Sequence, residues 1–235
     1  MLQARNHGDT AKTEERQSFA QKAGLDIDQF VPFDLLTGPP PLKTVLKHDA
    51  VMVGGSGDYY ISKKNLPQFE AQLDLLREVV DRGQPMFASC FGFQLVVKAL
   101  GGDVIYDPDA MEVGTFDLTL TQEGQQDELL GVLPNQFSAQ LGRKDRATNL
   151  PDSCIHLASS RRCPFQALRI LDKPIWATQF HPELSGAENL ARFKRYQKGY
   201  ASVMDKKEQQ AAFDRFNDSP ETETLIPRFL DVVFG

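Results

Sequence analysis

A cysteine placed between a strand-like and a helix-like segment constrains the fold of this chain more than any other feature. Residues 85–89 are typical of a buried strand, and residues 91–99 are typical of a helix that ends at Gly101-Gly102. Cys90 therefore lies on a sharp strand-to-helix turn, the form of a nucleophile elbow. Such a turn crowds its own backbone, and Ala88 and Gly92 provide small residues on both sides of it.

Strand-like and helix-like segments alternate around this turn. Helical patterns cover residues 14–24 and the segment after Pro67, and residues 49–53 form a short apolar strand that is expected to break at Gly54-Gly55. This alternation predicts a parallel sheet covered by helices on both faces. Further along, strand-like pieces lie at 154–159, 165–171 and 175–180, with few residues between them, which predicts antiparallel additions to the sheet.

We therefore expect a three-layer α/β sandwich with a mostly parallel, doubly wound sheet. Residues 1–185 are predicted to form the catalytic part, and residues 186–235 a helical C-terminal extension packed on the same domain. The chain begins with a very short first strand, and two explanations are open. Either the strand is short, or the stated start lies inside a longer strand.

Composition excludes several classes of function. A net charge of -6 disfavours nucleic-acid binding, and no apolar run is long enough to span a membrane. The basic residues Arg143, Lys144 and Arg146 are expected on a solvated loop. Three cysteines without a C-x-x-C pair or a histidine cluster predict no metal site and no disulfide framework, so a reducing, cytoplasmic setting is expected.

The turn at Cys90 also has electrostatic consequences. A thiol at a helix N-terminus is favoured as the thiolate because it lies at the positive end of the helix dipole. The backbone N–H of Phe91 would point toward a carbonyl oxygen under attack. A second donor is expected from Gly55, in the glycine-rich loop that follows the preceding strand, so the two would form an oxyanion hole.

A base for the thiol is predicted at the end of another strand. His181 follows the strand that ends at Phe180, and Glu183 comes two residues later, held close by the intervening proline. Taken singly, Cys90 is explained as a buried structural cysteine, and His181 and Glu183 as a loop histidine and a helix cap. Taken together, they supply a nucleophile, a base and a residue that orients the base.

These motifs resemble those of the class I (triad) glutamine amidotransferases. Cys90-Phe91-Gly92-Phe93-Gln94 matches the family's Cys-x-Gly-x-Gln signature, and the family's His-Pro-Glu follows at position 181, 91 positions later. The glycine loop at 54–57 and Glu112-Val113-Gly114 are also similar to family segments. The resemblance extends over about residues 1–185, includes glutamine amidotransferase domains such as that of GMP synthase, and implies a flavodoxin-like fold.

The resemblance implies a reaction and a role for each residue. Cys90 would attack the side-chain amide of L-glutamine to form a thioester and release ammonia, with His181 carrying protons and Glu183 orienting it. Gln94 would contact the substrate. The reaction needs no cofactor or metal, and because no ATP-binding loop motif is present in the sequence, the ammonia would be supplied to a separate synthetase or acceptor subunit.

The sequence departs from the family pattern at the segment Gly142-Arg143-Lys144-Asp145, where GMP-synthase-type domains carry Ser-His-Gly-Asp. Ala88, in a position often held by glycine, is a milder change. Two other functions remain open: a γ-glutamyl peptide hydrolase that uses the same triad, and a binding module whose triad is inert.

Overall fold

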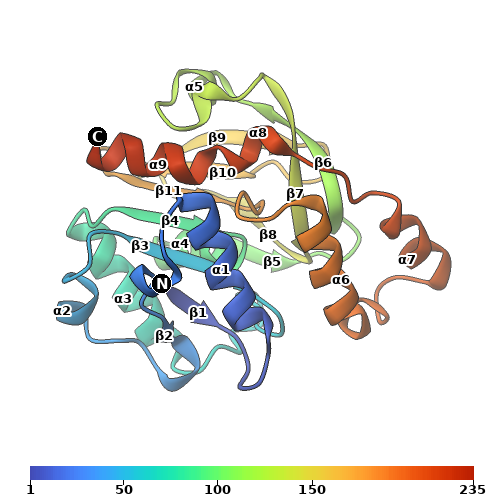
Figure 1. The fold of residues 1–235 in the computed structure, drawn as a ribbon, viewed down its shortest axis with the longest axis horizontal. Helices are drawn as coiled ribbons and strands as arrows, with labels where there is room; N and C mark the ends of the chain where they lie inside the picture. Colours follow the sequence, from blue (N-terminus) through green and yellow to red (C-terminus); the bar gives the residue numbers. More distant parts are fainter.

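The computed structural model describes all residues from 1 to 235 and has a nine-stranded mixed sheet as its framework, with strand order β2-β1-β3-β4-β11-β10-β9-β6-β7 (Figure 1). A separate two-stranded sheet pairs β5 with β8. The strands are β1 Leu2–Ala4, β2 Phe33–Asp34, β3 Val51–Ser56, β4 Met86–Ser89, β5 Asp103–Tyr106, β6 Glu112–Leu120, β7 Gln136–Arg143, β8 Asp145–Asn149, β9 Cys154–Ser160, β10 Ala167–Ile170 and β11 Ile175–Thr178.

Helices occupy most of the remaining chain. The α-helices are α1 Ala11–Ala23, α2 Leu42–Val45, α3 Phe69–Asp81, α4 Phe91–Ala99, α5 Gln122–Gln126, α6 Gly186–Tyr200, α7 Lys206–Phe213, α8 Pro220–Glu223 and α9 Leu225–Phe234. Three short 3₁₀ turns lie at Ile27–Gln29, Leu35–Thr37 and Leu130–Val132. No helix is long and apolar enough to cross a membrane.

The sheet has a parallel half and an antiparallel half. Strands β2, β1, β3, β4 and β11 run parallel, and β3 and β4 are apolar and buried because helices cover both of their faces. From β11 onward every neighbouring pair is antiparallel. Both halves agree with the sequence prediction. One detail was wrong: β3 runs through Gly54-Gly55 to Ser56 and does not break at the glycine pair.

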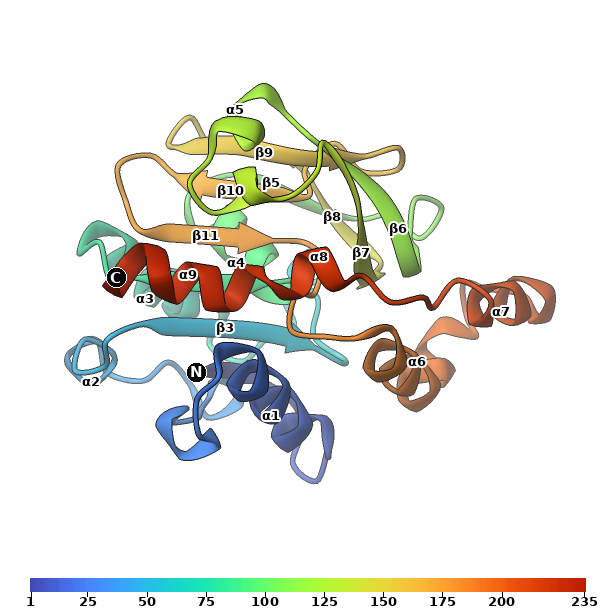
Figure 2. The same ribbon diagram turned by 45° about the horizontal axis from the view of Figure 1, so that its top comes forward.

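Helices on both faces of the sheet complete the three-layer fold (Figure 2). On one face, α1 and α9 pack on the sheet through Phe19 and Phe229, and Phe229 meets Trp176 edge-on at a ring-centroid distance of 6.0 Å. On the other face, α3 and α4 bury apolar side chains such as Leu76 and Val96. The helix predicted after Pro67 is confirmed as α3, and its regularly spaced apolar side chains Phe69, Leu73, Leu76 and Val80 are all buried.

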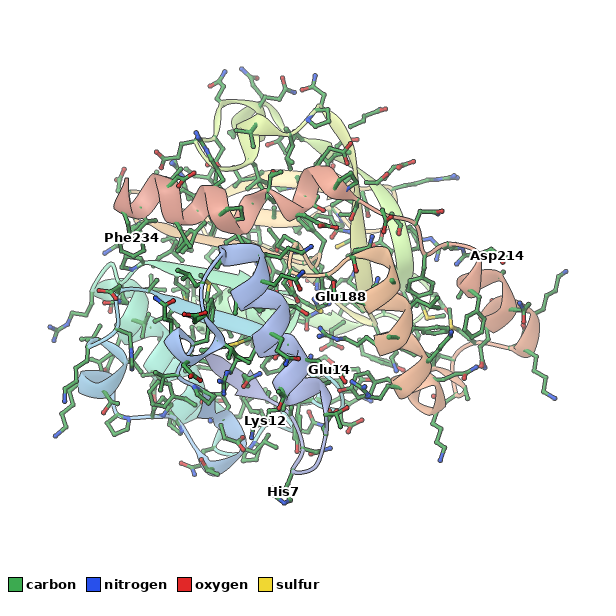
Figure 3. All side chains as sticks on the ribbon, viewed as in Figure 1. His7, Lys12, Glu14, Glu188, Asp214 and Phe234 are labelled. Carbon is green, nitrogen blue, oxygen red and sulfur yellow. The ribbon has the colours of Figure 1, made fainter.

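Helix α6 lies beyond the carboxyl ends of the parallel strands and is fastened to α1. Arg195 of α6 pairs with Glu14 of α1 through both carboxylate oxygens, and Ser18 of α1 donates to Glu188 at 2.9 Å. Figure 3 labels Glu14 and Glu188 on the two neighbouring helices. This attachment holds α6 at the sheet edge where open α/β folds bind their ligands.

Candidate active site

The turn between β4 and α4 has the geometry that its sequence predicts. Cys90 has φ 52° and ψ −100°, a backbone conformation that residues other than glycine rarely adopt. Its N–H donates to the carbonyl of Thr178 at 2.7 Å, which ties the turn to β11. A Cβ on Gly92 would lie 2.7 Å from the carbonyl oxygen of Val53, so only glycine allows α4 to start this close to β3.

His181 and Glu183 follow β11 and lie beside this turn. The Nδ1 atom of His181 is 2.6 Å from Oε1 of Glu183, and His181 lines the same pocket as Cys90. All three side chains are buried. Burial opposes the charged imidazolium, but the negative charges of Glu183 and Cys90 outweigh it and raise the pKa of His181 to about 10. The imidazole of His181 is therefore protonated at neutral pH.

A buried cation from α6, which the sequence analysis missed, also faces this cluster. Nη1 of Arg192 lies 3.8 Å from Oε1 of Glu183 and 3.9 Å from Oε1 of Glu15 on α1. Burial is the main cause of a lowered pKa of Arg192. No local motif marks this residue, because it reaches the site through the packing of α6 against α1.

Of the two predicted oxyanion donors, one N–H is free and the other is hydrogen-bonded within the protein. Helix α4 begins at Phe91, so the N–H of Phe91 has no acceptor within the helix and is available at the thiol. The N–H of Gly55 instead donates to Oε1 of Glu15 at 2.8 Å, and that buried carboxylate also accepts from Arg5 at 2.7 Å. The N–H of Gly55 is thus occupied by Glu15, and its role as an oxyanion donor remains a prediction.

Gly55 nonetheless contributes to the site by its size. A Cβ at this position would lie 3.1 Å from Cε1 of His181, so the missing side chain leaves room for the imidazole. Glycine is thus needed here for close packing, which is a different reason from the one that the sequence suggested.

Gln94 lines the pocket as predicted, but both of its N–H groups are used within the protein. Its Nε2 donates to the carbonyl oxygen of Asp145 at 3.1 Å and to Oε1 of Gln179 at 3.0 Å. Gln94 therefore links the elbow helix to the start of β8 and to the segment after β11. Direct contact with a substrate remains a prediction for this residue.

These side chains share one pocket of about 300 Å³ with Cys90 at its base. Cys90, Phe91, Gln94 and His181 form one wall. The opposite wall comes from the segment 142–145 and from α6, whose lining residues are Asn189, Arg192, Phe193, Arg195, Tyr196, Lys198, Gly199 and Tyr200. No group of three or more His, Cys, Asp or Glu side chains is arranged to hold a metal ion.

The segment 142–145 is buried, which corrects the prediction of a solvated basic loop. Arg143 lies opposite Glu112 in the β6–β7 ladder, and its Nη2 is 2.5 Å from Oε2 of Glu112. Ser160 and Gln166 donate to the same carboxylate. Arg143 is thus neutralised by a buried partner, and its neighbour Lys144 is also buried, with 7% of the residue exposed.

A cysteine on a strained strand-to-helix turn, beside a histidine paired with a glutamate, is an arrangement typical of α/β enzymes that use a cysteine nucleophile. The sequence profile described as Glutamine amidotransferase class-I matches residues 41–195. The chain therefore belongs to the class I glutamine amidotransferase family.

Curated relatives support the same family. The chain is 28% identical over 155 residues to a protein of Methanothermobacter thermautotrophicus that is named as one subunit of a glutamine-hydrolyzing GMP synthase, and the match covers 66% of this chain and 76% of that protein. It is 29% identical over 140 residues to the glutamine-hydrolyzing GMP synthase of Streptococcus mutans, covering 59% of this chain and 25% of that protein. The chain thus matches about a quarter of the longer relative.

Solved structures share the fold over nearly the whole chain. A glutamine amidotransferase from Thermotoga maritima has a TM-score of 0.71 at 16% identity, covering 99% of this chain and 96% of that one. One from Methylobacillus flagellatus has a TM-score of 0.73 at 17% identity, covering 98% and 94%. The expected α/β fold of the family is confirmed by these two likenesses.

Proposed function

We propose that the chain hydrolyses the side-chain amide of L-glutamine, with Cys90 as nucleophile, His181 as acid and base, and Glu183 as the residue that orients His181. The observation that carries this proposal is the position of Cys90 at the head of α4, in one pocket with a histidine whose Nδ1 is 2.6 Å from Oε1 of Glu183. Membership of the glutamine amidotransferase family supplies the substrate.

The reaction follows from these contacts in two halves. The Cys90 thiolate attacks the amide carbon, and the oxygen of the resulting intermediate faces the free N–H of Phe91. His181 gives its proton to the departing nitrogen, so the carbon–nitrogen bond breaks and ammonia is released. A glutamyl thioester remains on Cys90. His181, now neutral, takes a proton from water, which attacks the thioester; glutamate leaves, and the thiolate and imidazolium are restored.

We further propose that the ammonia is used by a separate acceptor subunit. Two relatives support this: the Methanothermobacter protein is named as one subunit of a GMP synthase, and the matched region is about a quarter of the longer Streptococcus mutans protein. The acceptor chemistry of those relatives is therefore expected to reside outside the region that corresponds to this chain.

The direct test measures ammonia and glutamate released from L-glutamine by the purified chain and by the variant Cys90→Ala. We expect equal amounts of both products, and a loss of at least about 10⁴-fold in the variant, because the nucleophile acts together with its base. Release that does not depend on Cys90 would refute the mechanism. Turnover of γ-glutamyl peptides without turnover of glutamine would identify the alternative hydrolase.

A further inference from the structure

Lys144 is a buried cation in the active-site pocket that has no carboxylate partner. The other buried cations that line the pocket, Arg5, Arg143 and Arg192, each lie within 4 Å of a glutamate. Lys144 forms no such pair, although only 7% of the residue is exposed. An unpaired buried charge is costly, so a site that keeps one indicates a partner that arrives with the ligand.

The surroundings of Lys144 hold the ammonium group in place and leave donors free. Its Nζ donates to the carbonyl of Gly199 at 2.7 Å, which uses one of its three N–H groups. The rings of Tyr200 and Tyr60 lie 4.4 and 5.4 Å from Nζ. These contacts fix the side chain against α6 and against the loop after β3, in the pocket that Cys90 also lines.

The charged groups around Lys144 do not neutralise it. Burial, followed by repulsion from Lys63, lowers the pKa of Lys144 to about 8, and Asp58 and Asp145 oppose that shift only in part. Asp145 is itself engaged, because its two oxygens accept hydrogen bonds from the N–H and hydroxyl of Ser62. An anion bound in the pocket would neutralise the remaining positive charge of Lys144.

Lys144 lines the same pocket as Cys90, where the amide of a bound substrate would lie. The carbonyl of the next residue, Asp145, accepts from Gln94, one helical turn after Cys90. Tyr200, whose ring lies 4.4 Å from Nζ of Lys144, lines the same pocket as Cys90. In an extended glutamine the α-carboxylate is four bonds from the amide carbon, about 5 Å away.

We propose that Lys144 binds the α-carboxylate of the γ-glutamyl substrate and selects substrates in which that group is free. This inference rests on the proposed glutamine hydrolysis. GMP-synthase-type domains carry glycine at the corresponding place in Ser-His-Gly-Asp, so the lysine side chain is an addition of this chain. Lys144 thereby supplies a charge-assisted contact at the segment where the sequence departs from the family pattern.

The test compares L-glutamine with L-glutaminamide, in which the α-carboxylate is replaced by a neutral amide. For Lys144→Met we expect kcat/KM for L-glutamine to fall about 10- to 100-fold, mainly through KM, because one charge-assisted hydrogen bond is lost. The value for L-glutaminamide should change by less than about twofold. Lys144→Arg should restore part of the preference, and Lys194→Met, at an exposed position of α6 outside the pocket, is the matched control.

A second measurement keeps this inference separate from the proposed reaction. Alkylation of Cys90 by iodoacetamide reports binding without turnover, and L-glutamine should protect Cys90 more strongly than L-glutaminamide in the wild type but not in Lys144→Met. Equal losses of kcat/KM for L-glutamine and L-glutaminamide in Lys144→Met would overturn the proposal. An unchanged preference of this variant for L-glutamine would overturn it as well. Absence of turnover together with Lys144-dependent protection would refute the hydrolysis alone.

Discussion

The two walls of the pocket are built in different ways. The wall with Cys90 and His181 is set by the main chain, through a strained turn, a required glycine and the ends of two adjacent parallel strands. The facing wall is set by side-chain pairs between segments far apart in sequence, such as Arg143 with Glu112 and Lys144 with the carbonyl of Gly199.

This difference separates chemistry from selection. In the proposed reaction the main-chain wall holds the reacting groups, and its geometry follows from short motifs shared with the family. The side-chain wall is the one that we propose to select the ligand, and it lies where this chain departs from the family pattern. Changes to the first wall should therefore abolish turnover, whereas changes to the second should alter stability or substrate preference.

After loss of the nucleophile itself, the largest effect is expected from Glu183→Gln, which preserves shape but removes the charge beside His181. We expect kcat to fall by about 10² to 10⁴-fold, because the imidazolium loses its partner at 2.6 Å and its orientation is no longer enforced. Steady-state ammonia release measures this. Glu221→Gln on exposed α8 is the matched control, and a similar loss there would contradict the assignment.

The difference in the free energy of unfolding between the wild type and Glu183→Gln should depend on pH. The folded pKa of His181 is raised from 6.5 to about 10, so protonated His181 stabilises the fold fully below about pH 6.5 and loses that contribution as the pH rises through about 10. The stability advantage of the wild type over Glu183→Gln should shrink by up to about 1.4 kcal/mol per pH unit in this interval. Urea unfolding at several pH values measures it, and a constant difference would contradict the ion pair.

On the facing wall, Arg143→Met should destabilise the fold by about 3–5 kcal/mol, since it leaves the Glu112 carboxylate buried without its cation. Arg146→Met, on neighbouring β8, removes a partly exposed pair with Asp107 and should cost about 1 kcal/mol or less. Urea unfolding of the two variants compares them directly. Equal decreases in the free energy of unfolding for the two variants would mean that burial does not make the Arg143–Glu112 pair more important than the Arg146–Asp107 pair.

The sequence predicted the first wall well and the second poorly, for a physical reason. Cys90 and His181 are recognisable because strand–turn–helix patterns and strand ends are local, and parallel strands then bring them together. Arg192 reaches Glu183 only through the packing of α6 against α1. The occupied N–H of Gly55 and the buried Lys144 depend on contacts 40 and 55 positions away along the chain, which no local pattern encodes.

The smallest expected effect is a difference in stability that tests the backbone strain of the turn at Cys90 and does not depend on catalysis. Cys90→Gly and Cys90→Ala both remove the thiol, so they differ only in whether a Cβ must adopt φ 52°. We expect the glycine variant to be more stable by about 1 kcal/mol, because relief of strain exceeds the added entropy of the unfolded chain. Ala88→Gly, in regular strand β4, should show the opposite sign and lose at least about 0.5–1 kcal/mol. If glycine destabilises both positions alike, the turn stores no strain, and the thiol must be held by side-chain contacts, as the facing wall is.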